Sequence, residues 1–187
     1  VYNGLHLEGK MGEIFEKLEK QKHIIVATEG LTKTDYINNT EFQGAQDPHI
    51  WFDVALWSKA VQHIGNELIQ LSIDSIADQF AKNTEAYRTQ LSNLSNQVEN
   101  ELGSLDSNKR ILITAHDAFS YFGRAYNFEV KGLQGISTTS EYGLKDVSDL
   151  VNYIVDNEIK AVFVESSVSE KSLQAVVEGC LQKNHQV

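Results

Sequence analysis

Two histidines lie at positions where a side chain can take part in chemistry. His116 follows an apolar run at 110–114 and precedes a helical pattern, and His49 follows an Asp-Pro pair and precedes another helical pattern. A neutral imidazole is a common metal ligand and a common acid–base group. The two histidines are far apart in the sequence and form no local ligand pattern, so spacing alone favours a structural role for each.

Glu165 occupies a position that corresponds to that of His116, because it follows another apolar run, at 161–164. In open α/β sheets, ligands bind at the carboxyl ends of the strands. His116 and Glu165 are therefore expected to converge on one cleft. The position of His116 after a predicted strand favours a functional role, whereas its spacing from His49 does not.

The remaining histidines and the single cysteine give weaker signals. His6 lies near a predicted turn with a carboxylate two residues away, and it is kept as a minor candidate for metal contact without being assigned as a ligand. The other histidines are expected to be incidental, namely His23, His63 and His185. Cys180 is alone, so an internal disulfide and a four-cysteine zinc site are both excluded.

Enzymatic motifs are missing from the sequence. There is no Gly-x-Ser-x-Gly elbow, no phosphate-binding Gly-x-x-x-x-Gly-Lys loop and no His-Glu-x-x-His helix. Catalysis is therefore not the leading interpretation, and the chain is not expected to be an enzyme. The enzymatic alternative is a metal-dependent hydrolase in which His49, His116 and Glu165 hold zinc and leave a coordination position open for water.

Alternating strand and helix patterns must position these residues. Short apolar runs predict strands at 24–27, 110–114, 128–133 and 161–164, and helical periodicity predicts helices at 10–19, 50–71, 76–105, 117–126, 144–157 and 170–183. Polar loops are predicted at 31–46 and 135–141. Continuous apolar strands separated by helices are typical of a parallel sheet covered on both faces, so the predicted fold class is α/β.

The helical pattern at 76–105 is unusually long. About 30 residues would make a rod of about 45 Å, because an α-helix rises 1.5 Å per residue. Its apolar side chains form a narrow stripe and the other faces are polar. The helix is interpreted either as a packed surface helix or as a rigid connector between two lobes.

Composition excludes some partners. The net charge of −10 and the isoelectric point of about 5.0 disfavour binding to nucleic acid, whose phosphates such a surface repels. No run of apolar residues is long enough for a membrane span, and the first residues do not resemble a signal peptide. The compartment stays open on these grounds.

Several motifs together resemble a known family. They are Asn3-Gly4-Leu5, Asp47-Pro48-His49-Ile50-Trp51 and Thr114-Ala115-His116-Asp117-Ala118-Phe119, with support from 131–137 and 162–167. In this order and spacing they are similar to the zinc/manganese solute-binding proteins of bacterial ABC importers. The resemblance implies two α/β lobes joined by one long helix, with residues 1–75 in the N-terminal lobe, 76–106 as the connecting helix and 107–187 in the C-terminal lobe.

The same resemblance implies a ligand set for the metal. His49 would be a ligand from the first lobe and His116 one from the second, while Glu165 would line the cleft without contacting the metal. Family members with histidine at the position of His116 favour zinc, and imidazole does suit zinc well; manganese stays open. The family's first and last ligands lie outside residues 1–187, so the chain is expected to be an internal segment of a longer protein.

The implied function is extracytoplasmic capture of zinc or manganese and delivery to an ABC importer permease. The protein would be periplasmic or held at the cell surface by a lipid anchor. An adhesin that uses the same fold is the alternative binding function, and the sequence does not separate adhesion from delivery.

Overall fold

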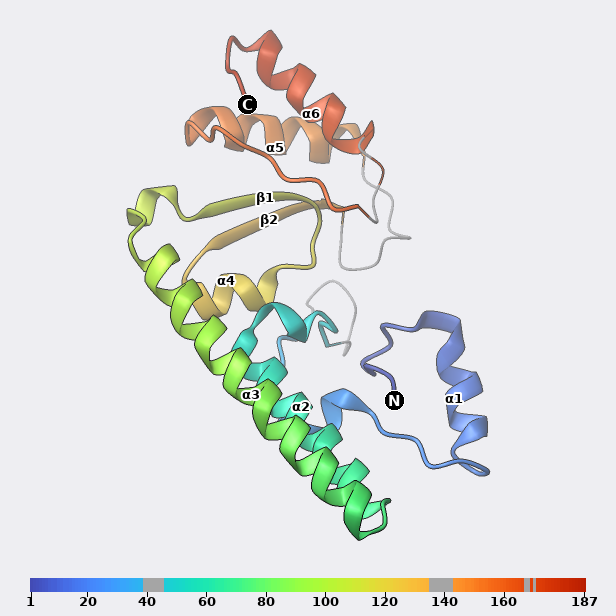
Figure 1. Ribbon diagram of the computed structural model, residues 1–187. Coiled ribbons are helices and arrows are strands. Elements are labelled where there is room, and N and C mark those ends of the chain that lie inside the picture. The colour runs from blue at the N-terminus through green and yellow to red at the C-terminus, as the bar shows by residue number, and fades with distance from the viewer. Residues whose placement is uncertain (39–45, 135–142, 167–168, 170) are drawn as a thin grey trace. The chain divides into compact units, whose positions relative to one another are not determined.

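The computed structural model describes residues 1–38, 46–134, 143–166, 169 and 171–187, and it divides into two compact units. Unit 1 is Val1–Gly103 and unit 2 is Ser104–Val187. The described residues are mainly helical with a small parallel sheet, which confirms the predicted α/β class (Figure 1). The predicted loop at 135–141 and residues 39–45 of the loop at 31–46 lie outside the described residues.

Unit 1 is built around a long pair of helices. Its elements are the 3₁₀ helices η1 (Gly9–Met11), η2 (Ala27–Gly30) and η3 (Ile50–Phe52) and the α-helices α1 (Gly12–Leu18), α2 (Val54–Gln70) and α3 (Asp74–Gly103). The helix predicted from residue 50 therefore begins with one 3₁₀ turn. Asp53 then caps α2, because its carboxylate accepts a hydrogen bond from the backbone N–H of Leu56 at 3.1 Å.

Helices α2 and α3 pack closely against each other. Gly65 allows this approach, since a Cβ at that position would lie 2.3 Å from Oγ1 of Thr84. An apolar pocket of about 370 Å³ lies along the same pair, and Trp57 donates a hydrogen bond to the Tyr87 hydroxyl at 3.3 Å. Helix α3 has 30 residues, of which only Leu91 is buried. The predicted role of α3 as a connector, and the lobe boundaries with it, stay predictions.

Helix length alone does not make a membrane span. α3 is long enough to cross a bilayer, but its sequence is polar on most faces. Among the described residues, no helix combines the length and the apolar character that a transmembrane segment needs.

The predicted strand at 24–27 is wrong. Val26 forms a single parallel bridge with Tyr2, through hydrogen bonds from Tyr2 N–H to the Ile25 carbonyl (3.1 Å) and from Ala27 N–H to the Tyr2 carbonyl (2.8 Å). The chain then turns into η2. The apolar run is buried as expected, but its backbone pairs with too short a segment to make a ladder.

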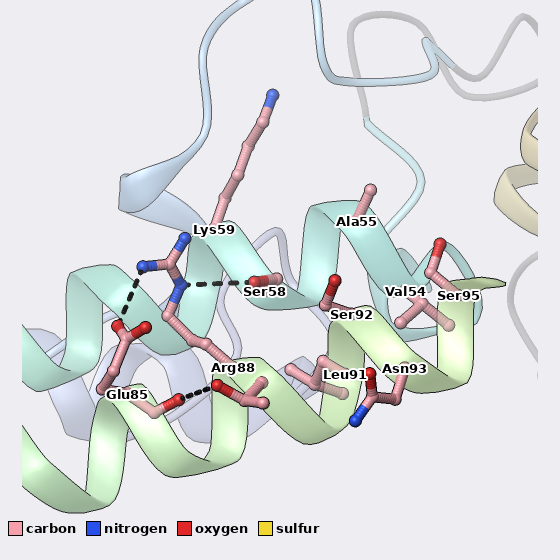
Figure 2. Close-up of a pocket in the computed structure, with 11 residues that line it drawn as sticks. Val54, Ala55, Ser58, Lys59, Glu85, Arg88, Leu91, Ser92, Asn93 and Ser95 are labelled. Atoms are coloured by element: carbon pink, nitrogen blue, oxygen red, sulfur yellow. Dashed lines mark hydrogen bonds and ion pairs between the residues drawn. The ribbon is translucent and has the colours of Figure 1, made fainter.

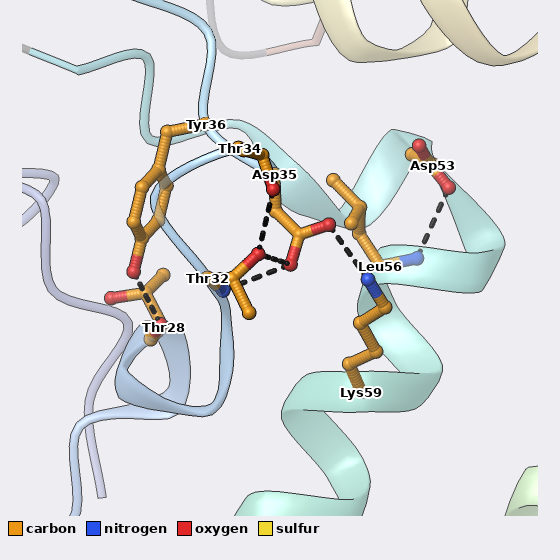
Figure 3. Close-up of polar contacts among 8 residues, drawn as sticks. All are labelled: Thr28, Thr32, Thr34, Asp35, Tyr36, Asp53, Leu56 and Lys59. Atoms are coloured by element: carbon orange, nitrogen blue, oxygen red, sulfur yellow. Dashed lines mark hydrogen bonds and ion pairs between the residues drawn. The ribbon is translucent and has the colours of Figure 1, made fainter.

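A polar network ties the segment after η2 to α2 (Figure 3). The Asp35 carboxylate accepts a hydrogen bond from the Lys59 ammonium at 2.6 Å, and it also accepts from the backbone N–H and the hydroxyl of Thr32 at 2.9 Å. Burial alone would raise the pKa of Asp35. The bonds from Lys59 and Thr32 outweigh burial and lower the pKa from 3.8 to about 2.

This lowered pKa predicts an acid-sensitive contribution to stability. A folded-state pKa below the unfolded value stabilises the protein above about pH 4, and the effect is lost as the pH falls toward 2. The pKa shift corresponds to at most about 2 kcal/mol, and we expect about 1 kcal/mol because water screens the half-exposed Lys59. Asp35→Asn should be less stable than the unchanged chain by this amount at pH 5, in urea unfolding.

At pH 2.5 the difference between the two proteins should be clearly smaller than at pH 5, because most of the Asp35 contribution has been lost. The exposed pair Asp106–Lys109, 3.0 Å apart, provides the matched control, since Asp106→Asn should change little at either pH. A stability difference for Asp35→Asn that is the same at both pH values would contradict the assignment.

Unit 2 contains the parallel sheet. Its elements are η4 (Ser107–Lys109), β1 (Ile111–His116), α4 (Ser120–Tyr126), β2 (Glu129–Gln134), α5 (Leu144–Asp156) and α6 (Lys171–Gln182). The pairing of β1 and β2 is parallel, from Ile111 opposite Glu129 to His116 opposite Gln134. Figure 1 shows α4, the crossover between the two strands, on one side of them and α5 and α6 on the other, so helices lie on both faces of the strand pair.

The segment at 161–164 is not the full strand that was predicted. Phe163 makes one parallel bridge to Thr114, with hydrogen bonds to Ile113 and Ala115 of β1. β1 therefore lies between this segment and β2. Among the described residues the segment pairs on one side only, and Phe163 and Val164 are exposed.

The core of unit 2 lies between the sheet and the helices α5 and α6. It consists of buried apolar side chains from all these elements: Ile113, Ala115, Leu133, Leu150, Val151, Ile154, Ile159, Leu173, Val176 and Cys180. Burial raises the pKa of the Cys180 thiol, so this side chain behaves as a small core residue. The core fixes β1 and with it the position of His116.

Candidate metal centre

His49 lies in the turn that leads into α2. Pro48 precedes it, and its backbone is followed at once by η3 and by the Asp53 cap of α2. Its side chain is buried, with 5% of its surface exposed. The ring of Trp51 packs edge-on against the imidazole, with 5.2 Å between the ring centroids. His49 is therefore held in a largely dry place by the start of a long helix.

Asp47 contacts His49 twice. Its Oδ1 atom lies 2.8 Å from Nδ1 of the His49 ring and accepts a hydrogen bond from the His49 backbone N–H at 2.9 Å. The Asp47 side chain is completely buried. Asp47 was not among the residues predicted to act at the site, although a carboxylate two residues before a candidate ligand was a visible signal.

The first residues of the chain support this turn. The side-chain amide of Asn3 donates a hydrogen bond to the Pro48 carbonyl at 3.1 Å. Asn3 is held in turn by the Glu8 carboxylate, which accepts from its backbone N–H at 2.7 Å. Gly4 follows with φ +93°, where a Cβ would meet the side chains of Val26 and Thr28 within 2.6 Å. Only glycine fits this position.

The surroundings of His6 do not support a role in metal binding. It adopts φ +62°, and its side chain is exposed. Among the residues that the structure describes, it joins no group of side chains that could hold a metal. Its minor candidacy gains no support from this geometry.

His116 is the last residue of β1, although the strand was predicted to end at residue 114. The strand continues to His116 because its backbone still pairs with Gln134 of β2. The side chain of His116 is buried, with 6% exposed. The Thr114 hydroxyl donates to the His116 carbonyl at 2.8 Å, which fixes the end of the strand.

Glu165 lies beside His116, as the strand order predicts. Its Oε1 atom accepts a hydrogen bond from the His116 backbone N–H at 3.3 Å. Its Oε2 atom is buried and makes no hydrogen bond to any of the described residues. A buried carboxylate oxygen normally has a partner, so this oxygen can accept a further N–H, a water molecule or a cation.

The structure therefore brings Glu165 to His116 within unit 2 and places His49 in unit 1. Among the described residues, no three His, Cys, Asp or Glu side chains gather closely enough to hold a metal ion. Joint binding of one metal by His49 and His116 stays a prediction.

A separate surface pocket of about 490 Å³ lies between α2 and α3 (Figure 2). Arg88 of α3 extends across it and donates to the Ser58 hydroxyl of α2 at 3.3 Å, and it forms an ion pair with Glu85 at 3.7 Å. The guanidinium also donates to Gln62. Neither His49 nor His116 lines this pocket, and Arg88 links α3 to α2 across it.

Comparison with known proteins covers nearly the whole chain. Residues 1–184 match the family described as zinc-uptake complex component A, periplasmic. The manganese-binding lipoprotein MntA of Bacillus subtilis (strain 168) is 46% identical over 187 residues, which are 100% of this chain and 60% of that relative. The zinc-binding protein TroA of Treponema pallidum (strain Nichols) is 40% identical over 187 residues, again 100% of this chain and 60% of the relative.

A solved structure gives the same result for the fold. The periplasmic zinc-binding protein TroA from Treponema pallidum superimposes with a TM-score of 0.93 at 40% identity, and the match covers 100% of this chain and 66% of that one. The chain thus spans about 60% of the length of the curated relatives that it matches. These matches confirm the resemblance that the motifs indicated. The chain belongs to the periplasmic zinc-uptake complex component A family.

Proposed function

We propose that the protein to which this chain belongs captures a divalent transition metal outside the cytoplasm and delivers it to an ABC-type importer. The observation that carries the proposal is the buried His49 imidazole with its Nδ1 atom 2.8 Å from a buried carboxylate oxygen. Metal-bound histidines characteristically have such a carboxylate partner on the nitrogen that does not bind the metal. The family description and the names of the two relatives support it.

In this proposal His49 and His116 are ligands of one ion, and Glu165 stays beside His116 without contacting the metal. Both imidazoles bind in their neutral form, so capture releases protons and weakens in acid. A closed zinc site has four protein ligands, so further ligands must join these two histidines. The ion is cargo, and no covalent step accompanies its capture or release.

Zinc is the favoured cargo and manganese the alternative. Two imidazole ligands suit zinc better than manganese, which prefers oxygen ligands. The Treponema relative is named for zinc and the Bacillus relative for manganese, so both ions must be tested. The proposed location is the periplasm or a lipid-anchored position at the cell surface, where the partner is the importer's permease. We propose no enzymatic activity.

Chelator competition with zinc and with manganese tests this function. It should be run on residues 1–187 and on a version extended at both ends along its own gene. The extended protein should bind one ion per molecule, tightly, and residues 1–187 more weakly. Deletion of the gene should reduce cellular uptake of the same metal. Metal-dependent turnover of phosphate or peptide esters would support the hydrolase alternative instead, and an extended protein that binds neither ion would refute the proposal.

A further inference from the structure

We propose that Asp47 is a positioning residue for His49: it keeps a proton on Nδ1 of the imidazole and thereby leaves Nε2 as the nitrogen that binds metal. This inference rests on the proposed function, in which His49 is a ligand. It follows from the contacts at Oδ1 of Asp47, which lies 2.8 Å from Nδ1 and 2.9 Å from the backbone nitrogen of the same histidine.

The two contacts at Oδ1 of Asp47 indicate which atoms donate the protons. The backbone N–H of His49 can only donate, so Oδ1 already acts as an acceptor in that bond. At 2.8 Å, Nδ1 and Oδ1 are also within hydrogen-bond distance, and because an ionised carboxylate can only accept, the ring supplies the proton. The neutral imidazole carries one proton, so Nε2 keeps its lone pair.

The imidazole ring of His49 is held in place by its neighbours. Pro48 lies between Asp47 and His49 and restricts the backbone there to a narrow range of φ. Asn3 holds the Pro48 carbonyl, and Trp51 packs against the ring edge-on. The orientation of the imidazole is thus fixed before any metal arrives, and binding does not have to order it.

The carboxylate of Asp47 is buried. Asp47 has no exposed side-chain surface, so water does not compete for its hydrogen bonds. A hydrogen bond to a carboxylate is stronger than one between neutral groups, and a carboxylate on the far nitrogen makes an imidazole a better ligand. Loss of such an outer partner typically lowers metal affinity by about 10- to 100-fold.

A purely structural role for Asp47 is the competing explanation. An aspartate that accepts the backbone N–H two residues ahead forms an Asx turn, and Asp47 satisfies this geometry. Asparagine supports the same turn equally well, and serine supports it weakly but is too short to reach the ring. Asp47→Asn and Asp47→Ser therefore separate a turn-forming role from a role in positioning the ring.

The test reads the ring proton directly in the extended, metal-free protein. Imidazole ¹⁵N NMR distinguishes a proton on Nδ1 from one on Nε2, and the His49 signals are the ones missing from the spectrum of His49→Gln. The same variants are then titrated with zinc by chelator competition. Asp53→Asn is the matched control, because it makes the same chemical change in the same segment and asparagine caps a helix as well as aspartate.

We expect the unchanged protein and Asp53→Asn to carry the proton on Nδ1. Asp47→Ser should shift the proton toward Nε2 and weaken zinc binding by about 10- to 100-fold, and Asp47→Asn should fall between the two. If Asp47→Ser does not fold, Asp47→Asn decides, because a purely structural role predicts unchanged affinity. A proton on Nε2 in the unchanged protein would overturn the inference. A proton on Nδ1 in a protein that binds no metal would instead refute the proposed function.

Discussion

Replacing either His49 or His116 with alanine should lower the affinity of the extended protein for zinc by at least about 100-fold. Loss of a partner that only orients a ligand already costs about 10- to 100-fold, and loss of the ligand itself must cost more. Both side chains are buried at ordered positions, one before η3 and one at the end of β1. The double variant should bind no more tightly than the weaker of the two single variants.

Chelator competition at neutral pH measures this effect for zinc and for manganese. His23→Ala and His6→Ala are the matched controls, because both side chains are exposed and neither is an assigned ligand. Thermal unfolding without metal shows whether each variant still folds. Equal affinity of the double variant and the unchanged protein would show that the metal binds elsewhere, and a large loss for His6→Ala would make His6 a ligand.

Shortening Ile154 to alanine should produce a large loss of stability. Ile154 is completely buried in the core of unit 2, where α5 packs against α6 and the sheet. Removal of a buried isoleucine side chain down to alanine costs about 2–5 kcal/mol, through lost burial and the cavity left behind. Ile154→Val removes one methylene and should cost about 0.5–1.5 kcal/mol.

Urea unfolding followed by circular dichroism tests this prediction. Leu144→Ala is the control, because Leu144 begins the same helix with 92% of its surface exposed and its loss should matter little. Both tryptophans, Trp51 and Trp57, belong to unit 1, so their fluorescence reports that unit separately. A loss for Ile154→Ala no larger than that for Leu144→Ala would mean that the described core does not stabilise unit 2.

The long helices and the main strands could be predicted from the sequence because their patterns repeat over many residues. The periodicity at 76–105 corresponds to α3 at Asp74–Gly103, and the helical pattern at 144–157 corresponds to α5 at Leu144–Asp156. Such a periodic pattern is a local property of the sequence. Whether such an element forms therefore depends little on the other contacts of the chain.

The short apolar runs at 24–27 and 161–164 were predicted as strands, but each makes one bridge. A strand exists only where a partner of sufficient length lies beside it, and an apolar run carries no information about its partner. For the same reason no role was predicted for Asp47. The sequence shows an aspartate at this position but does not show its contact with the His49 ring. His116 continues β1 for a comparable reason, since its pairing with Gln134 is set by the register of the sheet.

The order of elements along the chain also sets the time at which each candidate ligand is buried. α2 and α3 are joined by the short connection at 71–73, so their pairing closes only a short loop and is expected to form early in folding. β1 must wait for β2, then for Phe163 on its other side, and finally for α6 to close the core. A half-paired strand is a risk for aggregation during this interval. We therefore expect His116 to become sheltered from solvent later than His49 as the chain folds.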